Sequence, residues 1–176
     1  MEDNKSVKLV ACLSILGMLA TFPVFVSAYE PATTHAALSQ ETAKFFNVHY
    51  PNLTLSDEET LLFINGSVSE DDGLRMLQHF YDPVHNRGLS VAKEWQSSKE
   101  WAQDTLAQAS YNGNIISNPV AQVSYGTIKT LYSSDTDHSW DRAIYEYAWG
   151  NKERGLQTLG HILHLLQDAS VPDHTR

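Results

Sequence analysis

Near its end the chain reads Leu159-Gly160-His161-Ile162-Leu163-His164-Leu165-Leu166-Gln167-Asp168-Ala169-Ser170-Val171-Pro172-Asp173-His174. His164 and Asp168 stand four residues apart, so they share one face of a predicted helix and can bind one cation together. The neighbouring stripe of this helix is apolar and consists of Leu159, Leu163 and Leu166. An unpaired charge in such surroundings would be costly. The alternative interpretation is a His–Asp contact that only stabilises the helix, followed by a surface histidine at position 174.

Helical patterns extend over most of the chain and predict an all-α domain. Ser56 with Glu59 forms a capping box, and Gly66 is expected to end the helix that follows. The predicted helices cover residues 34–46, 56–66, 69–82, 91–109, 139–149 and 151–170. Turn-forming residues occur between Asn112 and Pro119, and the alternation typical of strands is nearly absent. Val120 to Leu131 is the one ambiguous stretch, and helix is favoured there as well.

The first 28 residues have the pattern of a secretory signal peptide. A weakly basic start precedes an apolar run from Leu9 to Val26, and Val26-Ser27-Ala28 fits a cleavage site. We therefore expect residues 29–176 to form one mature domain that begins at Tyr29, is secreted or periplasmic, and has no membrane anchor. Cleavage would remove Cys12, the single cysteine, so the core or bound ions must stabilise the domain in place of disulfides.

The chain carries a formal net charge of −9 at pH 7. A surface of this sign is a poor nonspecific binder of nucleic acid and of anionic membranes. Bound divalent cations would offset part of the charge locally. The acidity is therefore compatible with a metal site.

Three further residues are candidate metal ligands, and each has a plainer alternative. Asp71 stands at a predicted helix start, where an aspartate usually caps the helix or interacts with its dipole. His79 stands near the end of an apolar helix, where a histidine is often a hydrogen-bonded core residue. His35 occupies the first turn of the first predicted helix, where side chains are usually solvated.

The combination of these residues resembles a known family. The run His164-x3-Asp168-x5-His174, with Pro172 inside it, is similar to the zinc-binding run of the zinc-dependent phospholipases C, relatives of the Bacillus phosphatidylcholine-preferring enzyme. Three other segments resemble motifs of the same family in the same order, namely Thr34-His35-x-x-Leu38, Asn65-Gly66-x4-Asp71 and His79-Phe80-Tyr81-Asp82-Pro83. The resemblance therefore extends from about Thr34 to the last residue.

The resemblance implies a multi-helical fold of the phospholipase C/P1 nuclease type with up to three zinc ions. The first ion would be surrounded by Asp71, His79, His164 and Asp168. His35 would hold the second ion, with Asp168 as a bridging carboxylate. The family adds the amine of an N-terminal tryptophan to this ion, and the predicted mature terminus here is Tyr29.

His174 would bind the third zinc ion, whose other ligands in the family are a His-x3-Glu pair farther along. No such pair occurs before Arg176. The resemblance therefore implies that the chain lacks C-terminal helices of the family. We expect it to hold one or two zinc ions and to be weakly active or inactive.

The implied activity is that of a secreted, monomeric phosphoesterase that hydrolyses phospholipid phosphodiester bonds through a zinc-activated water. The resemblance favours Asp71 as the catalytic residue that accepts the proton of this water. The expected substrate is a phospholipid at a membrane surface, and no nucleic acid is expected. Two alternatives stay open, a single-strand nuclease or nucleotidase of the S1/P1 type and a non-catalytic secreted module that metal stabilises. The segment from His79 to Pro83 favours the phospholipase over the nuclease.

Four histidines remain outside the implied ligand set. His161 replaces an apolar residue of the Bacillus relative and lies one turn before His164. It is an extra ligand, a hydrogen-bond donor to a ligand, or a packed or solvated histidine, and the last interpretation is favoured. We expect the other three to be surface residues: His49, His85 and His138.

Overall fold

The computed structural model describes residues 31–91, 93–111 and 134–175, which form a mostly helical domain. The helices are α2 (Pro31–His49), α3 (Asp57–Ser69), α4 (Ser98–Trp101), α5 (Thr105–Ala109), α7 (Trp140–Trp149) and α8 (Lys152–Asp168), with one 3-10 turn, η1 (Arg75–Gln78). Two short strands, β1 (Ser90–Val91) and β2 (Lys93–Glu94), pair in antiparallel orientation. The helical content of the described residues confirms the all-α prediction.

Several predictions fall outside the described residues. They concern the signal peptide, the mature terminus at Tyr29, the turn-rich connection at 112–119 and the ambiguous stretch at 120–131. Among the helices that the structure describes, none is both long enough and apolar enough to cross a membrane.

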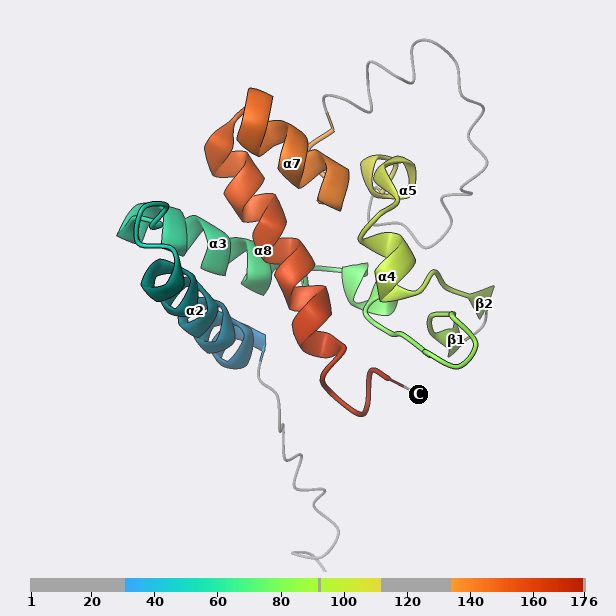
Figure 1. The fold of residues 1–176 in the computed structure, drawn as a ribbon. Helices are drawn as coiled ribbons and strands as arrows, with labels where there is room; N and C mark the ends of the chain where they lie inside the picture. Colours follow the sequence, from blue (N-terminus) through green and yellow to red (C-terminus); the bar gives the residue numbers. More distant parts are fainter. Residues whose placement is uncertain (1–30, 92, 112–133, 176) are drawn as a thin grey trace, which may run out of the picture.

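Helix α8 crosses the middle of the domain and brings the other long helices together. It packs against α3 and against α7, and α2 lies beside α3 and also contacts α8 (Figure 1). The apolar core gathers around these contacts and consists of Ala43, Phe63, Trp101, Ala143, Leu156, Ile162 and Leu165. Burial of these side chains is the main force that holds α8 against its neighbours.

Local capping fixes where the long helices begin. The backbone N–H of Glu59 donates to Ser56 Oγ at 3.1 Å, and Ser56 N–H donates to Glu59 Oε2 at 2.9 Å, which completes the predicted capping box of α3. Ser139 caps α7 and Asn151 caps α8 through their side-chain oxygens. The predicted starts of these three helices are confirmed.

Gly66 does not end its helix, contrary to the sequence prediction. It lies inside α3 and is buried, and a Cβ atom at this position would overlap the carbonyl oxygen of Gln157 in α8. A Cβ atom at Gly160 would likewise overlap the carbonyl oxygen of Phe63 in α3. The two glycines therefore allow the backbones of α3 and α8 to approach each other closely, and this crossing sets the distance between the two helices that carry the site.

Two other helix predictions are wrong in extent. The helix expected over 69–82 is replaced by η1, because Gly73 adopts a left-handed conformation (φ 66°) that interrupts a regular helix. The helix expected over 91–109 is divided into β2 and the short helices α4 and α5. Ser97 and Asp104 cap these two helices, and their polar side chains break the longer pattern into two starts.

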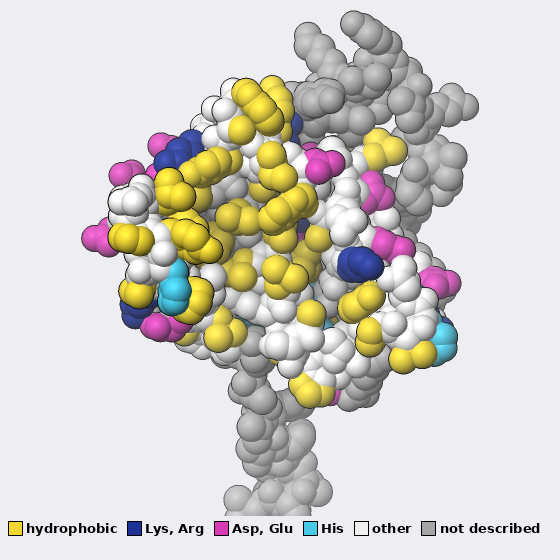
Figure 2. Space-filling model, viewed as in Figure 1, with side chains coloured by type: hydrophobic (Ala, Val, Ile, Leu, Met, Phe, Trp, Pro, Cys, Tyr) yellow, Lys and Arg dark blue, Asp and Glu magenta, His cyan; other side chains and the backbone are white. Residues whose placement is uncertain are grey.

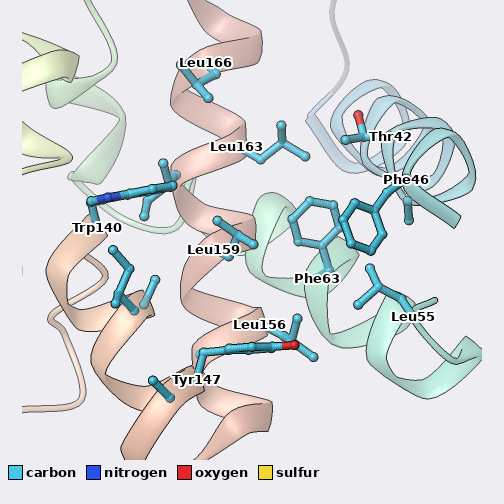
Figure 3. A pocket seen from close by; sticks show the side chains of 16 residues that line it. Thr42, Phe46, Leu55, Phe63, Trp140, Tyr147, Leu156, Leu159, Leu163 and Leu166 are labelled. Carbon is cyan, nitrogen blue, oxygen red and sulfur yellow. The ribbon is translucent and has the colours of Figure 1, made fainter. Parts of the chain in front are cut away.

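The apolar stripe of α8 lines an open groove. This groove has a volume of about 480 Å³ and lies between α8, α7 and the helices α2 and α3 (Figure 3). Its walls include Leu159, Leu163 and Leu166, and Leu166 is 65% exposed. Figure 2 shows apolar side chains gathered over this face of the molecule. Leu166 stands two residues after His164, so the two side chains point in nearly opposite directions from the helix axis, about 200° apart. The groove and His164 therefore lie on opposite sides of α8.

Candidate metal centre

Four segments bring their polar side chains to one buried position. His35 comes from the second turn of α2, and Asp71 follows the end of α3 by two residues. His79 follows η1 directly, and α8 contributes His164 and Asp168. The structure therefore gathers five of the six ligands predicted from the sequence in a single cluster.

The α8 pair and His79 form the more deeply buried half of the cluster. Asp168 Oδ2 lies 2.9 Å from His79 Nδ1 and 3.2 Å from His164 Nε2. The two ring nitrogens are themselves 3.2 Å apart. The three side chains expose 2% of their surface or less, so no water-filled space separates them. Their ligand atoms converge closely enough to hold one metal ion.

His35 and Asp71 form the second half of the cluster, together with His164. Asp71 Oδ1 lies 3.6 Å from His164 Nε2, and His35 Nε2 lies 3.4 Å from Asp168 Oδ1. His35, Asp71 and His164 form a second group whose ligand atoms could hold a metal ion. Asp168 therefore turns one oxygen toward His79 and His164 and the other toward His35, which is the arrangement that a bridging carboxylate needs.

Hydrogen bonds around the cluster fix which nitrogen of two rings faces it. His164 Nδ1 donates to the backbone carbonyl of Ser67 at 2.6 Å, and His35 Nδ1 donates to Gln167 Oε1 at 2.6 Å. Gln167 in turn donates to Ser39 Oγ at 3.1 Å. With the proton held on Nδ1, the Nε2 atom of each ring presents its lone pair to the centre, as a metal-ligating histidine requires.

The electrostatics of the cluster favour a cation. Burial opposes ionisation of Asp168, but the His164 and His79 rings beside it hold the pKa of its carboxyl well below the ordinary value. Burial likewise acts to lower the pKa of His164, and the Asp168 carboxylate raises it above the ordinary value. Burial and the His164 ring lower the pKa of His35. The centre is thus a buried carboxylate anion with imidazole nitrogens around it.

The donor set fits a transition metal. Asp168 Oδ2 is buried and has no hydrogen bond of good geometry among the described residues, although two ring nitrogens lie within 3.2 Å of it. A cation would satisfy these converging lone pairs together. Imidazole nitrogen and carboxylate oxygen are ligands that zinc and related divalent metals accept. The buried His and Asp groups can therefore hold a metal ion.

His174 lies beside the cluster rather than in it. Its Nδ1 atom is 3.7 Å from Asp168 Oδ1, and its ring packs against Phe80 with the ring centroids 5.0 Å apart. Its backbone carbonyl accepts a hydrogen bond from the N–H of Tyr81 at 2.8 Å. About a quarter of its side chain is exposed (27%). His174 belongs to neither of the two ligand groups found among the described residues.

A buried polar network that was not predicted from the sequence lies next to the centre. Glu70 is completely buried and binds Arg75 through two nitrogens, each 2.8 Å from Oε2. His161 Nδ1 donates to the same oxygen at 2.6 Å, and Trp101 Nε1 donates to Oε1 at 3.1 Å. Burial opposes ionisation of Glu70, but Arg75 and His161 hold its pKa well below the ordinary value. No residue spacing in the sequence indicates this network, because its members come from distant segments.

The surroundings of His161 and His138 in this network test what was predicted for these two histidines. His161 is buried and hydrogen-bonded, so it is a packed histidine and not a solvated one, and it belongs to neither ligand group. His138 is half-buried rather than exposed, contrary to the prediction. Its ring stacks on that of His161 with centroids 3.7 Å apart, and burial together with the His161 ring lowers its pKa to about 2. His49 and His85 are exposed, as predicted.

Comparison with known proteins identifies no relative. No protein-family model matches the chain, and no curated protein or solved structure is significantly similar to it.

Proposed function

We propose that this chain is a zinc-dependent phosphodiesterase of the phospholipase C type. The observation that carries the proposal is the buried cluster in which His35, His164 and Asp168 converge with two further donors. The four sequence motifs that resemble the zinc-dependent phospholipases C supply these same five donors. The proposal includes export of the domain, with the mature chain beginning at Tyr29.

Zinc is the proposed ion because of the ligands. Three imidazoles and two carboxylates form a set of nitrogen and oxygen donors that zinc binds well, whereas magnesium and calcium prefer oxygen alone. Asp168 turns one oxygen toward His79 and His164 and the other toward His35, so its carboxylate suits two ions held close together, whereas the single Nε2 lone pair of His164 serves one of them. When bound, such ions lower the pKa of a water toward neutrality and neutralise charge on a phosphate.

The donors of the cluster have different roles in the proposed reaction. Asp71 is the most accessible of the five donors, since a quarter of its side chain is exposed (25%). It is therefore the carboxylate best placed to meet an attacking water and accept its proton, as the resemblance also implies. His164 and His35 are held in one tautomer by Ser67 and Gln167 and so have a fixed orientation before any ligand arrives.

The choice of a phospholipid over a nucleic acid is supported by two observations. The net charge of −9 opposes the binding of a polyanionic strand over an extended surface. The segment from His79 to Pro83 resembles the phospholipase motif more than the nuclease motif. We therefore propose that the chain cleaves the phosphodiester bond on the diacylglycerol side and releases a phosphorylated headgroup.

The test combines metal analysis with two substrates. The full chain is loaded with zinc, its metal content is measured by mass spectrometry, and hydrolysis of phosphatidylcholine vesicles and of single-stranded DNA is followed. The same assays are repeated after EDTA and after zinc is restored. We expect retained zinc and a low, EDTA-sensitive release of phosphocholine. Hydrolysis of DNA alone would favour the nuclease, and retained zinc without any hydrolysis would favour a non-catalytic module. Unchanged helicity in EDTA with neither zinc nor hydrolysis would overturn the proposal.

Matched variants separate the roles of the ligands. His164→Ala is expected to abolish zinc retention, because His164 belongs to both donor groups. His49→Ala is the control, since this histidine is exposed and lies outside both groups. Asp71→Asn should retain at least one zinc ion and lose about 100-fold or more in hydrolysis if Asp71 is the base. Equal zinc content in H164A and H49A would show that the ligand assignment is wrong.

A further inference from the structure

Glu70 is a buried carboxylate that the proposed chemistry does not use. It precedes Asp71 in the chain and caps the C-terminal end of α3, yet its side chain has no measurable exposure. A fully buried carboxylate is retained at a cost in desolvation and needs partners for both oxygens. Its position between the metal cluster and the network around Arg75 suggests a task beyond packing.

The partners of Glu70 hold its carboxylate in one place. Arg75 binds Oε2 and is itself held by the side chain of Gln108 at 3.0 Å, and His161 donates to the same oxygen. Trp101 is the one hydrogen-bond donor to Oε1 among the described residues. Oε1 therefore keeps a free lone pair, while the carboxylate as a whole cannot rotate away.

That free lone pair faces His79. The ring of His79 turns Nδ1 toward Asp168, at 2.9 Å, and its Nε2 atom lies 3.9 Å from Glu70 Oε1. Nε2 is buried and has no hydrogen-bond partner among the described residues. A histidine that binds a metal through Nδ1 carries its proton on Nε2, and this proton needs an acceptor. Glu70 Oε1 is the acceptor that the structure offers.

The other two imidazoles of the cluster have neutral acceptors. His164 donates to a backbone carbonyl and His35 donates to a glutamine side chain. An ionised carboxylate behind His79 would differ from both, because it increases the basicity of the ring in addition to orienting it. Of the three histidines of the cluster, His79 is the one that no helix holds, since it follows the short turn η1. It therefore has the greatest need of a fixed partner.

We infer that Glu70 is a positioning residue of the metal centre, which accepts the Nε2 proton of His79 and orients its Nδ1 atom toward the metal. The inference rests on the metal binding proposed above. A displacement of the His79 ring by about 1 Å would bring Nε2 within hydrogen-bond distance of Oε1. His161, Arg75 and Trp101 act through Glu70, since they hold its carboxylate where the ring can reach it.

The experiment measures zinc affinity and the protonation of the His79 ring. Zinc dissociation constants of the full chain are determined by competition with a chelator of known affinity. Glu70→Gln keeps the size of the side chain and removes its charge, and it should weaken zinc binding about 10- to 100-fold. Glu58→Gln makes the same change at an exposed position in the first turn of α3 and is the control, so its zinc affinity should stay within about threefold of the original. Nitrogen NMR of the zinc-loaded protein should show a hydrogen-bonded Nε2 proton on His79 that E70Q lacks.

A purely structural role of Glu70 gives a different result. If Glu70 has only this role, E70Q lowers the free energy of unfolding of the metal-free protein and leaves the zinc affinity of the folded protein unchanged. This outcome would overturn the inference. If E70Q fails to fold because Arg75 is left unpaired, the double variant with Glu70→Gln and Arg75→Met removes both buried charges and is measured in its place. Absence of zinc binding by the original chain would overturn the proposed function as well, whereas equal binding by the original and E70Q would overturn only the role of Glu70.

Discussion

The protonation of individual side chains sets the balance between the metal-free and the metal-bound centre. In the metal-free protein a protonated His164 beside ionised Asp168 stabilises the fold. Because the folded-state pKa of His164 is raised, this contribution is complete below its ordinary pKa of about 6.5 and is lost as pH rises through the raised value. A metal ion takes the place of that proton, so protons and zinc compete for the same nitrogen.

Zinc affinity is therefore expected to rise steeply with pH from about 6 to 8. Isothermal titration calorimetry in buffers of different ionisation enthalpy should show proton release on binding, and the release should decrease as pH rises through the raised pKa of His164. The control is His49→Ala, which should leave this dependence unaltered because His49 is exposed and lies outside the two ligand groups. A zinc affinity that does not change between these pH values would contradict the competition.

The residues of the site differ in how well the sequence predicts them. His164, Asp168 and His79 are predictable because their side chains carry the ligand atoms and stand in recognisable motifs. The acceptor of His164 is a backbone carbonyl. Every residue has such a carbonyl, so the sequence does not indicate which one accepts the hydrogen bond. Glu70 was missed for another reason. Its burial depends on partners 31 and 91 residues away in the chain, and no local pattern reports such contacts.

At the scale of elements, the crossing of α3 and α8 determines the geometry of the site. Asp71 follows α3, and the two ligands of α8 lie on the face that meets it. The crossing is close because Gly66 and Gly160 leave no side chain between the backbones. The capping box of α3 and the start of α8 at Asn151 were predicted correctly from local sequence, but the close approach depends on two segments that are far apart in the chain. A glycine that permits packing looks the same in sequence as a glycine that ends a helix.

Substitution of either glycine by alanine should separate the two helices. Gly66→Ala and Gly160→Ala each place a methyl group against a backbone carbonyl, and we expect a loss of about 1–3 kcal/mol in the free energy of unfolding. Zinc affinity should also fall, because Asp71 moves relative to His164. Gln40→Ala on the exposed face of α2 is the control. Chemical denaturation measures the first effect, and chelator competition measures the second. Stability and zinc affinity equal to those of Q40A would show that the crossing tolerates a methyl group.

At the scale of the whole molecule, the centre connects three segments that are far apart in the chain. His35 ties the start of α2 to α8, and His79 ties the segment after η1 to the same helix. Metal binding to the folded state would therefore stabilise the complete domain and reduce local opening at both places.

A zinc concentration 100 times the dissociation constant should raise the free energy of unfolding by about 2.7 kcal/mol. Hydrogen exchange should slow most in the first turns of α2 and at residues 76–82, because ligands from these segments lose their freedom when the ion binds. EDTA should reverse both effects. Calcium serves as the control cation, since imidazole-rich sites bind it poorly. Equal stabilisation by calcium and zinc would argue against an imidazole site.

The placement of His164 and Asp168 in the last two turns of α8 has a consequence for the order of binding. Aligned peptide dipoles give the C-terminus of a helix a partial negative charge of about half an elementary charge. The C-terminal end of α3 lies close by, with Asp71 just beyond it. Both helix ends therefore direct negative potential at one buried point. A phosphate group would be repelled from that point until cations occupy it, so the field of the fold itself would require metal to bind before an anionic substrate.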